Sequence, residues 1–158
     1  MEIERIPHMQ KQEYDRLIRE NHVCRIAFQG EDYPYIAPFI YIFDGQYLYC
    51  LSTKYGKKID LFRKNPSVAV EIEEYARDLS AYSFVTLRGR LEEVAGKEAG
   101  RSIKERFTAL LRKGDLSYQI MAAFGHDPQD PPEALVREDR TLVWKLVGVR
   151  EIVALKSR

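Results

Sequence analysis

The chain has 158 residues, a length typical of one domain, and 45% of them are apolar, which is enough to build a buried core. Its 25 lysines and arginines almost balance its 24 aspartates and glutamates, so the net charge is +1 at pH 7. This balance excludes a global electrostatic drive toward nucleic acid or a membrane surface, and we expect neither as a partner. Any anion site must be a local cluster.

Three features bear on where the protein works. No segment approaches the roughly 18 consecutive apolar residues of a membrane-spanning helix. Residues 1–14 carry several charges and lack the apolar stretch of a signal peptide. Cys24 and Cys50 lie in apolar strand patterns without metal-ligand spacing, so we expect buried free thiols. Together these features predict a cytoplasmic protein.

Apolar periodicity predicts six strands and three or four helices. Expected strands span 23–29, 33–43, 46–51, 67–74, 82–94 and 141–155, the last as one strand or two. Expected helices span 10–20, 57–64, 97–113 and 116–124. Asp44-Gly45 marks a hairpin turn, and residues 125–132 form a proline-rich loop. Gly89 within a strand indicates a bulge or a close backbone approach.

The order of these elements favours a mainly β fold. Strands follow one another like hairpins, and only one short helix interrupts them between 33 and 94. We therefore predict a six-stranded antiparallel β-barrel with peripheral helices. It forms a single domain over 1–158, with a helical insert at about 97–124.

Pro38 interrupts an otherwise apolar strand. Proline has no N–H to donate and is found on sheet edges or at bulges. Two explanations remain open: an ordinary edge strand, or a break in the ladder whose free backbone groups bind a ligand.

The segment from Ser52 to Lys58 combines two hydroxyls, Gly56 and paired lysines at the start of a helix. Backbone N–H groups at a helix N-terminus attract anions. The segment is not a P-loop, because Leu51 and Lys58 stand where that motif needs glycine and Ser or Thr. It indicates a phosphate site, and a solvated basic helix start remains the alternative.

Aromatic residues are dense before this loop. The seven rings could offer a stacking surface for a flat cofactor or could simply fill a small barrel; they are Tyr33, Tyr35, Phe39, Tyr41, Phe43, Tyr47 and Tyr49. Trp144, in the last strand pattern, could cover a ring, fill an interface or pack in the core.

Metal and nucleophile chemistry find little support. His8, His22 and His126 lie in separate regions without ligand spacing. No G-x-S-x-G, H-E-x-x-H or Cys–His signature is present, and residues 125–132 lack the EF-hand register. We assign no metal ligand and no catalytic residue.

The sequence of these pieces resembles a known family. The resemblance rests on YPYIAPFIYIFDG, QYLYCLST and YGKKIDLFRKNPSVAVEIE, followed by a strand with Arg88-Gly89-Arg90. It points to the pyridoxamine 5′-phosphate oxidase-like, FMN-binding split-barrel family, with the nitroimidazole-resistance-like flavin-nucleotide-binding proteins as nearest branch. It covers residues 10–95 well and the final strand loosely.

The resemblance implies a homodimer with FMN at the subunit interface. Ser52, Thr53, Gly56, Lys57 and Lys58 match the segment that holds the FMN phosphate. The strand whose backbone lies along the flavin ring is matched by Ala37, Pro38, Phe39 and Ile40. Trp144 and the strand near Arg88 match positions that approach from the other subunit.

One departure narrows the activity. The true oxidases carry an arginine and a histidine close together near the C-terminus, and the last strand here has no histidine. Vitamin B6 oxidation is therefore not expected. We expect an FMN-dependent oxidoreductase that reduces a small molecule such as a nitro compound or quinone. The alternative is a non-catalytic flavin, deazaflavin or haem carrier, with His22 or His126 as the histidine candidates for haem.

Overall fold

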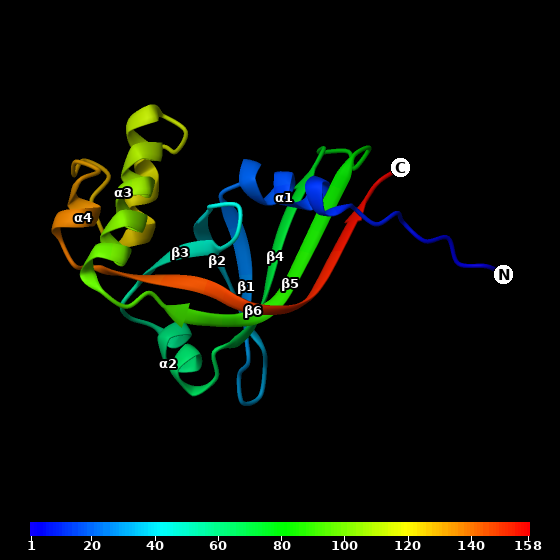
Figure 1. The fold of residues 1–158 in the computed structure, drawn as a ribbon, viewed down its shortest axis with the longest axis horizontal. Coiled ribbons are helices and arrows are strands. Elements are labelled where there is room, and N and C mark those ends of the chain that lie inside the picture. The colour runs from blue at the N-terminus through cyan, green and yellow to red at the C-terminus, as the bar shows by residue number, and fades with distance from the viewer.

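The computed structural model describes residues 1–158 as one closed antiparallel barrel with helical segments around it (Figure 1). Neighbouring strands run in the order β1-β2-β3-β6-β5-β4. The strands are β1 (Val23–Phe28), β2 (Tyr35–Phe43), β3 (Leu48–Thr53), β4 (Ser67–Tyr75), β5 (Tyr82–Glu93) and β6 (Thr141–Lys156). The helical segments are α1 (Lys11–Glu20), α2 (Lys57–Lys64), α3 (Lys97–Lys113), η1 (Tyr118–Phe124) and α4 (Ala134–Arg137). The predicted mainly β barrel is confirmed.

Several elements differ from the prediction in extent or type. β3 begins two residues later than expected, because the Asp44 carboxylate accepts hydrogen bonds from the N–H groups of Gln46 (2.8 Å) and Tyr47 (2.6 Å) and holds both in the turn. The expected helix at 116–124 is a 3₁₀ helix, η1, and the short helix α4 was not predicted. The final segment is one continuous strand.

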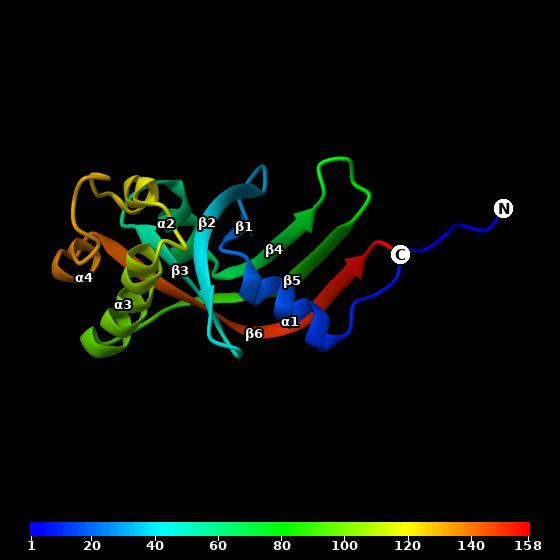
Figure 2. The same ribbon diagram turned by 90° about the horizontal axis from the view of Figure 1, so that it is seen from above.

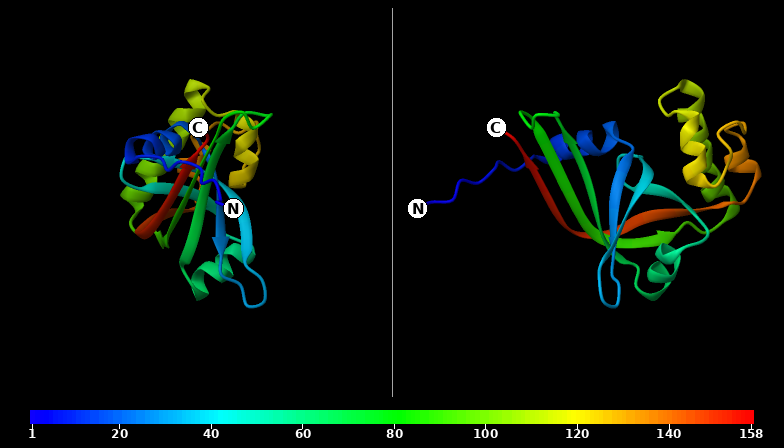
Figure 3. Two further views of the ribbon diagram at one scale, coloured as in Figure 1. Left: turned by 90° about the vertical axis from the view of Figure 1, so that its right-hand side faces the viewer. Right: turned by 180° about the vertical axis from the view of Figure 1, so that it is seen from behind.

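The last strand, β6, joins both halves of the barrel. Its first residues pair with β3, while residues from Trp144 onward pair with β5 (Figure 3). Between Arg88 and Arg90 the β5–β6 ladder shifts register, so that three residues of β6, 148–150, stand opposite the single Gly89. The predicted irregularity at Gly89 is confirmed, and the extra residues lie on β6. Gly148 adopts φ +58°, a backbone conformation that favours glycine.

Pro38 lies where β2 has a partner on one side only. Residues 35–40 of β2 pair with β1, but pairing with β3 begins only at Tyr41. The N–H of Tyr41 donates to the carbonyl of His22 (2.9 Å), and bonded pairs alternate along an antiparallel ladder. Ile36 and Pro38 therefore turn their backbone groups away from β1, toward the open side. The ladder is not broken: this half of β2 is an edge, with free backbone groups.

Buried residues form two clusters, one on each side of the barrel wall. The larger fills the barrel interior and includes Phe28, Tyr41 and Trp144. The smaller joins the outer face of β2, β3 and β6 to the helical insert, through residues such as Leu51 and Phe107. α3, η1 and α4 thus cover one end of the barrel, and both chain termini lie at the other end (Figure 2).

Cys24 and Cys50 are both buried in the interior cluster as free thiols, as predicted. Among the helices, none combines the length and the apolar character that crossing a membrane would need.

Candidate functional site

The predicted phosphate segment connects the end of β3 to the start of α2. Ser52 and Thr53 are the last residues of β3, and Gly56 precedes the helix with φ +102°. No side chain caps the first turn of α2; within it, the N–H of Ile59 bonds back to the carbonyl of Gly56 (3.1 Å). The first N–H groups of α2 therefore remain available to an anion.

Lys58 is the central charge of this segment. Its ammonium donates to the hydroxyl oxygen of Thr53 (2.9 Å) and lies 5.8 Å from the ring centroids of Phe39 and Tyr55. Burial lowers the pKa of Lys58, and no carboxylate forms an ion pair with it. A partly desolvated cation without a counter-charge is a suitable partner for a phosphate.

The other residues of the segment take different positions. Lys57 is exposed at the mouth of the site, with its ammonium 5.8 Å from the ring centroid of Tyr35. Ser52 is only 2% exposed, and its hydroxyl donates to the carbonyl of Thr53 (2.9 Å). Ser52 therefore fixes the turn from within. Thr53 is also buried and acts through its hydrogen bond with Lys58, so Gly56, Lys57 and Lys58 form the part of the segment that an anion could reach.

The predicted ring-binding strand borders the same region. The side chains of Ala37 and Phe39 pack against the barrel interior, whereas Pro38 is exposed and Ile40 is half-buried on the outer face. Phe39 links the strand to the phosphate segment through its contact with Lys58. The exposed backbone of β2 and the lysine pair thus lie on one side of the barrel.

The structure corrects the position expected for Trp144. Its side chain is 0% exposed and lies inside the barrel, with ring centroids 5.0 Å from Phe62, 5.7 Å from Phe39 and 5.9 Å from Phe28. An indole enclosed by other rings cannot cover a cofactor or fill a subunit interface. The core-packing alternative is the one that the structure shows.

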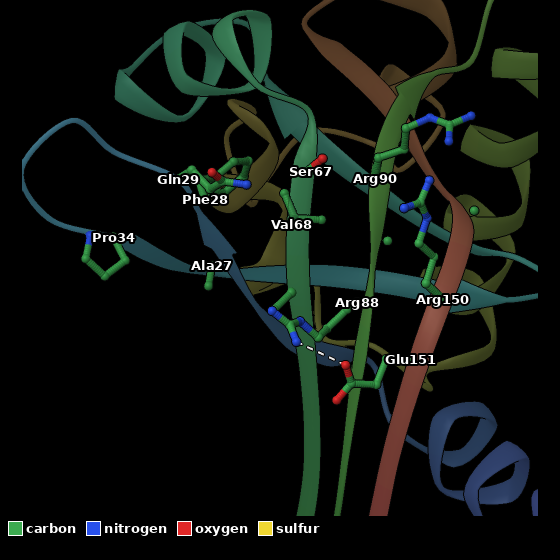
Figure 4. A pocket seen from close by; sticks show the side chains of 13 residues that line it. Ala27, Phe28, Gln29, Pro34, Ser67, Val68, Arg88, Arg90, Arg150 and Glu151 are labelled. Atoms are coloured by element: carbon green, nitrogen blue, oxygen red, sulfur yellow. Dashed lines mark hydrogen bonds and ion pairs between the residues drawn. The ribbon is translucent and has the colours of Figure 1, made fainter.

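A cavity of about 700 Å³ lies elsewhere, on the wall formed by β1, β4, β5 and β6 (Figure 4). Three arginines line it: Arg88, Arg90 and Arg150. Arg88 is paired with Glu151 (3.0 Å), while Arg90 and Arg150 form no ion pair with a carboxylate. The cavity shares no residue with the phosphate segment.

This cavity arises where β6 separates from β5. A Cβ at Gly89 would lie 2.8 Å from the carbonyl oxygen of Val147, and one at Gly148 would lie 2.8 Å from the Arg90 guanidinium. Gly89 is therefore required by the close approach of the β6 backbone, whereas Gly148 is favoured by its positive φ. The sequence drew attention to Arg88-Gly89-Arg90, but Arg150 was missed, although Gly148 two residues earlier repeats the pairing of glycine with arginine.

His126 lies next to the phosphate segment, in the predicted loop after η1. Its side chain is fully buried, and neither ring nitrogen has a hydrogen-bond partner. Burial and the nearby charge of Arg140 lower the pKa of His126, although Glu138 and Asp130 lie 3.8 and 3.9 Å away and oppose this. A Cβ at Gly125 would lie 3.6 Å from the methyl group of Thr53, so this loop supports the site from behind.

Ion pairs connect the helical insert to the same segment. Asp139 accepts Lys54 (2.8 Å) and the nearly buried Lys104 of α3 (3.7 Å). The insert is therefore attached to the phosphate segment by charge as well as by apolar packing. Nowhere do three or more His, Cys, Asp or Glu side chains gather as a metal site would require.

Comparison with known proteins decides the family. The model of the family described as pyridoxamine 5′-phosphate oxidase matches residues 10–144. This chain belongs to that family. An uncharacterised protein of Rhizobium meliloti (strain 1021) is 31% identical over 105 residues, which cover 66% of this chain and 68% of the relative.

Solved structures with the same fold have lower sequence identity. An FAD-binding protein of Mesorhizobium loti superposes with a TM-score of 0.66 at 19% identity, over 97% of this chain and 99% of its own. A protein of Bacteroides thetaiotaomicron described as a candidate 5-nitroimidazole antibiotic resistance protein has a TM-score of 0.62 at 19% identity, over 99% of this chain and 94% of its own. The haem storage protein HutZ of Vibrio cholerae gives 0.66 at 13% over 92% and 94%.

Although the chain belongs to this family, β6 lacks the arginine–histidine pair by which the resemblance marks the true oxidases. β6 presents Arg150 and Glu151 but no histidine, and the nearest histidine in the chain, His126, is enclosed beside the phosphate segment. The family fold is present without the pair of side chains that the vitamin-oxidising members would need.

Proposed function

We propose that this protein binds FMN and acts as an oxidoreductase that reduces a small molecule such as a nitro compound or quinone. The observation that carries the proposal is Lys58: a partly buried ammonium with no carboxylate partner, held against Thr53 at an uncapped helix start. The ammonium of Lys58 needs a counter-charge, and the phosphate of a flavin nucleotide supplies one.

The residues present fit such a cofactor. Lys57, Lys58 and the first N–H groups of α2 would hold the phosphate, while Thr53 orients Lys58. The exposed edge at Ile36 and Pro38 offers free backbone groups along which a flat ring can lie. When bound, the flavin supplies the electron transfer, and the chain binds and orients it.

A second copy of the chain completes the proposed site. Residues 148–153 of β6 are exposed, and they include Val149, Ile152 and Val153, each about 40% exposed. An exposed apolar segment of this kind is typical of an interaction surface. We infer a homodimer in which this part of β6, with the strand near Arg88, approaches the cofactor of the partner subunit.

The alternative is a carrier that holds a flavin, deazaflavin or haem without catalysis. The same phosphate segment would serve a deazaflavin nucleotide. Haem has less support, although HutZ shares the fold. His126 is fully enclosed, and the Nδ1 of half-buried His22 lies 3.2 Å from the carbonyl oxygen of Tyr41, so neither histidine is presented to a haem iron in this structure.

We place the protein in the cytoplasm, in keeping with its two free thiols.

One experiment separates these functions. The protein is purified without added cofactor, its absorbance is recorded, and the small molecule it retains is identified by mass spectrometry. We expect FMN, which an added nicotinamide donor reduces and a nitro compound or quinone reoxidises. A bound flavin that no donor reduces would support the carrier, and a protein that neither retains nor takes up FMN would refute the proposal.

A further inference from the structure

A second cavity, of about 370 Å³, lies between α1, the end of β2 and α3. Figures 1 and 2 show α1 and α3 on the side of the barrel away from α2, with the end of β2 between them. The cavity shares no residue with the phosphate segment or with the arginine cavity beside Gly89. We propose that it binds a small organic anion that carries an apolar group, such as an aromatic carboxylate.

Cations from two helices converge on this cavity. Arg19 comes from the last turn of α1, and Arg106 and Lys113 come from α3. None of the three forms an ion pair with a carboxylate, although twelve other lysines and arginines of the chain do. Three unpaired cations that line one cavity repel one another, and a bound anion relieves that repulsion.

The cavity contains no acidic side chain of its own. The carboxylate that Arg106 influences is Asp44, which accepts hydrogen bonds from Gln46 and Tyr47 in the hairpin turn. Burial alone raises the pKa of Asp44. The hydrogen bonds from these N–H groups and the charge of Arg106 lower it by more, so the pKa of Asp44 is below its ordinary value. Asp44 is thus already occupied and does not line the cavity.

The floor of the cavity is apolar. Ile42 of β2 lines it together with Ala109 and Leu110 of α3, and Ile42 and Leu110 both pack in the helical cluster. The side chain of Phe43 packs toward the barrel interior, with the Arg19 guanidinium 5.7 Å from its ring centroid. Small-molecule sites combine an apolar lining with a few convergent polar groups, which is the composition found here. The floor favours an aliphatic or aromatic body, and the cations select its acidic group.

Three of the four α3 residues that line the cavity are exposed, and the fourth, Leu110, also packs against the helical cluster. Arg106, Ala109, Leu110 and Lys113 follow the i, i+3, i+4, i+7 spacing of one helical stripe. The adjacent stripe, with Ile103 and Phe107, belongs to the buried cluster. Substitutions at the exposed positions Arg106 and Lys113 therefore test binding without removing the apolar contacts that hold α3 in place. Arg106 loses one long hydrogen bond, from its guanidinium to the carbonyl oxygen of Phe43 (3.5 Å).

The test uses 2-naphthoate as the probe and 2-naphthalenemethanol as its neutral counterpart, measured by isothermal titration calorimetry on the protein with FMN in excess. We expect naphthoate to bind at one site per chain, and the alcohol to bind at least tenfold more weakly. The double variant R106Q/K113Q should raise the Kd of naphthoate at least tenfold. Arg101→Gln, an exposed α3 residue paired with Glu105 (3.0 Å), is the matched control and should change nothing.

A second variant tests the same site by a different change. Ala109→Glu places a carboxylate at the exposed edge of the cavity and should abolish naphthoate binding, while circular dichroism shows that the fold is kept. Naphthoate binding that survives both R106Q/K113Q and A109E would overturn the proposal. So would the absence of binding at millimolar probe with FMN in excess. Binding seen only when FMN is left out would place the probe in the flavin site and would also overturn the proposal.

Discussion

The ammonium of Lys58 lies 2.9 Å from the hydroxyl oxygen of Thr53 and has no carboxylate within reach of an ion pair. Thr53 belongs to a barrel strand and Lys58 to the first turn of α2, so the hydrogen bond fixes a cation at the junction of the two elements. The interactions of that cation account for most of what we expect of the cofactor site.

Replacing Lys58 with Ala should weaken FMN binding. A charge-assisted hydrogen bond contributes about 1.5–3 kcal/mol, so we expect the Kd to rise roughly 10- to 150-fold, and more when Lys57 is also replaced. Quenching of flavin fluorescence on titration measures the change. Lys64→Ala, at the other end of the same helix, is the matched control and should leave the Kd unchanged. An unchanged Kd in the Lys58 variant would place the phosphate elsewhere.

FMN affinity should begin to fall at a lower pH than it would if the phosphate were bound by a lysine of ordinary pKa. Burial lowers the pKa of Lys58, and only the protonated ammonium can donate to the phosphate. As pH rises, the free protein loses this proton below the usual lysine value of about 10.4, and the Kd increases. Lys58→Arg keeps its charge throughout, so its affinity should vary less between pH 7 and 10. Identical pH profiles for the two proteins would contradict a phosphate contact by Lys58.

Trp144 should matter for stability and not for flavin affinity. Removing a buried tryptophan side chain costs about 3–5 kcal/mol, so Trp144→Ala should unfold at much lower urea concentration than the native chain. Trp144→Phe keeps an aromatic ring in the cluster, and we expect a smaller loss and an unchanged Kd for FMN. Because Trp144 is buried, its fluorescence emission should be blue-shifted in the native protein. All tryptophan emission comes from this residue, since the chain has no other tryptophan. A Phe variant that is stable yet fails to bind FMN would return Trp144 to the cofactor site.

His126 should make the protein sensitive to acid. Burial and Arg140 lower its pKa in the native state, while the unfolded chain titrates near 6.5. Below about pH 6.5 the unfolded state therefore takes up the proton first, and the free energy of unfolding falls by up to about 1.4 kcal/mol per pH unit. Above that pH His126 is neutral in both states, and the free energy of unfolding does not change through this residue.

Urea unfolding at pH 7.5 and pH 5 measures this effect in three proteins. His126→Gln should lose less stability between the two pH values than the native chain does. His22→Gln, which changes a half-buried histidine hydrogen-bonded through Nδ1, is the control and should lose as much as the native chain. Equal losses in all three proteins would show that other groups cause the acid sensitivity.

The proposed dimer predicts that Ile152→Glu yields a monomer. Ile152 is 43% exposed in the single chain, so a charge there is tolerated by the fold but not within an apolar interface. Light scattering after size-exclusion chromatography measures the mass. Ile3→Glu, an exposed apolar position in the N-terminal segment, should remain dimeric. A native protein that is already monomeric would remove the basis for a shared cofactor site.

The barrel itself was predictable, because strand alternation and turn signals are local properties of the sequence. The position of Trp144 was harder, since β6 is buried on both faces where it follows the insert: Val143 packs against the helical cluster and Trp144 against the barrel interior. A strand of that kind reads as a continuous apolar run, which does not reveal which side a residue faces.

The arginine cavity could not be predicted from local pattern. It depends on the register between Gly89 and Gly148, two residues almost sixty positions apart, and on β6 gaining residues relative to β5 there. The isolation of His126 has the same origin. Its loop looks polar and exposed in sequence, and the approach of Glu138, twelve residues later in the chain, depends on the tertiary fold.

The one-sided pairing of β2 also exposes the protein to a hazard. An unpaired strand edge can recruit the same edge of another molecule, and such pairing begins irreversible aggregation. At Pro38 the open edge has no N–H to offer, so a foreign strand finds the ladder interrupted at its midpoint. Pro38 thus interrupts such a ladder at the same edge that we propose for the ligand.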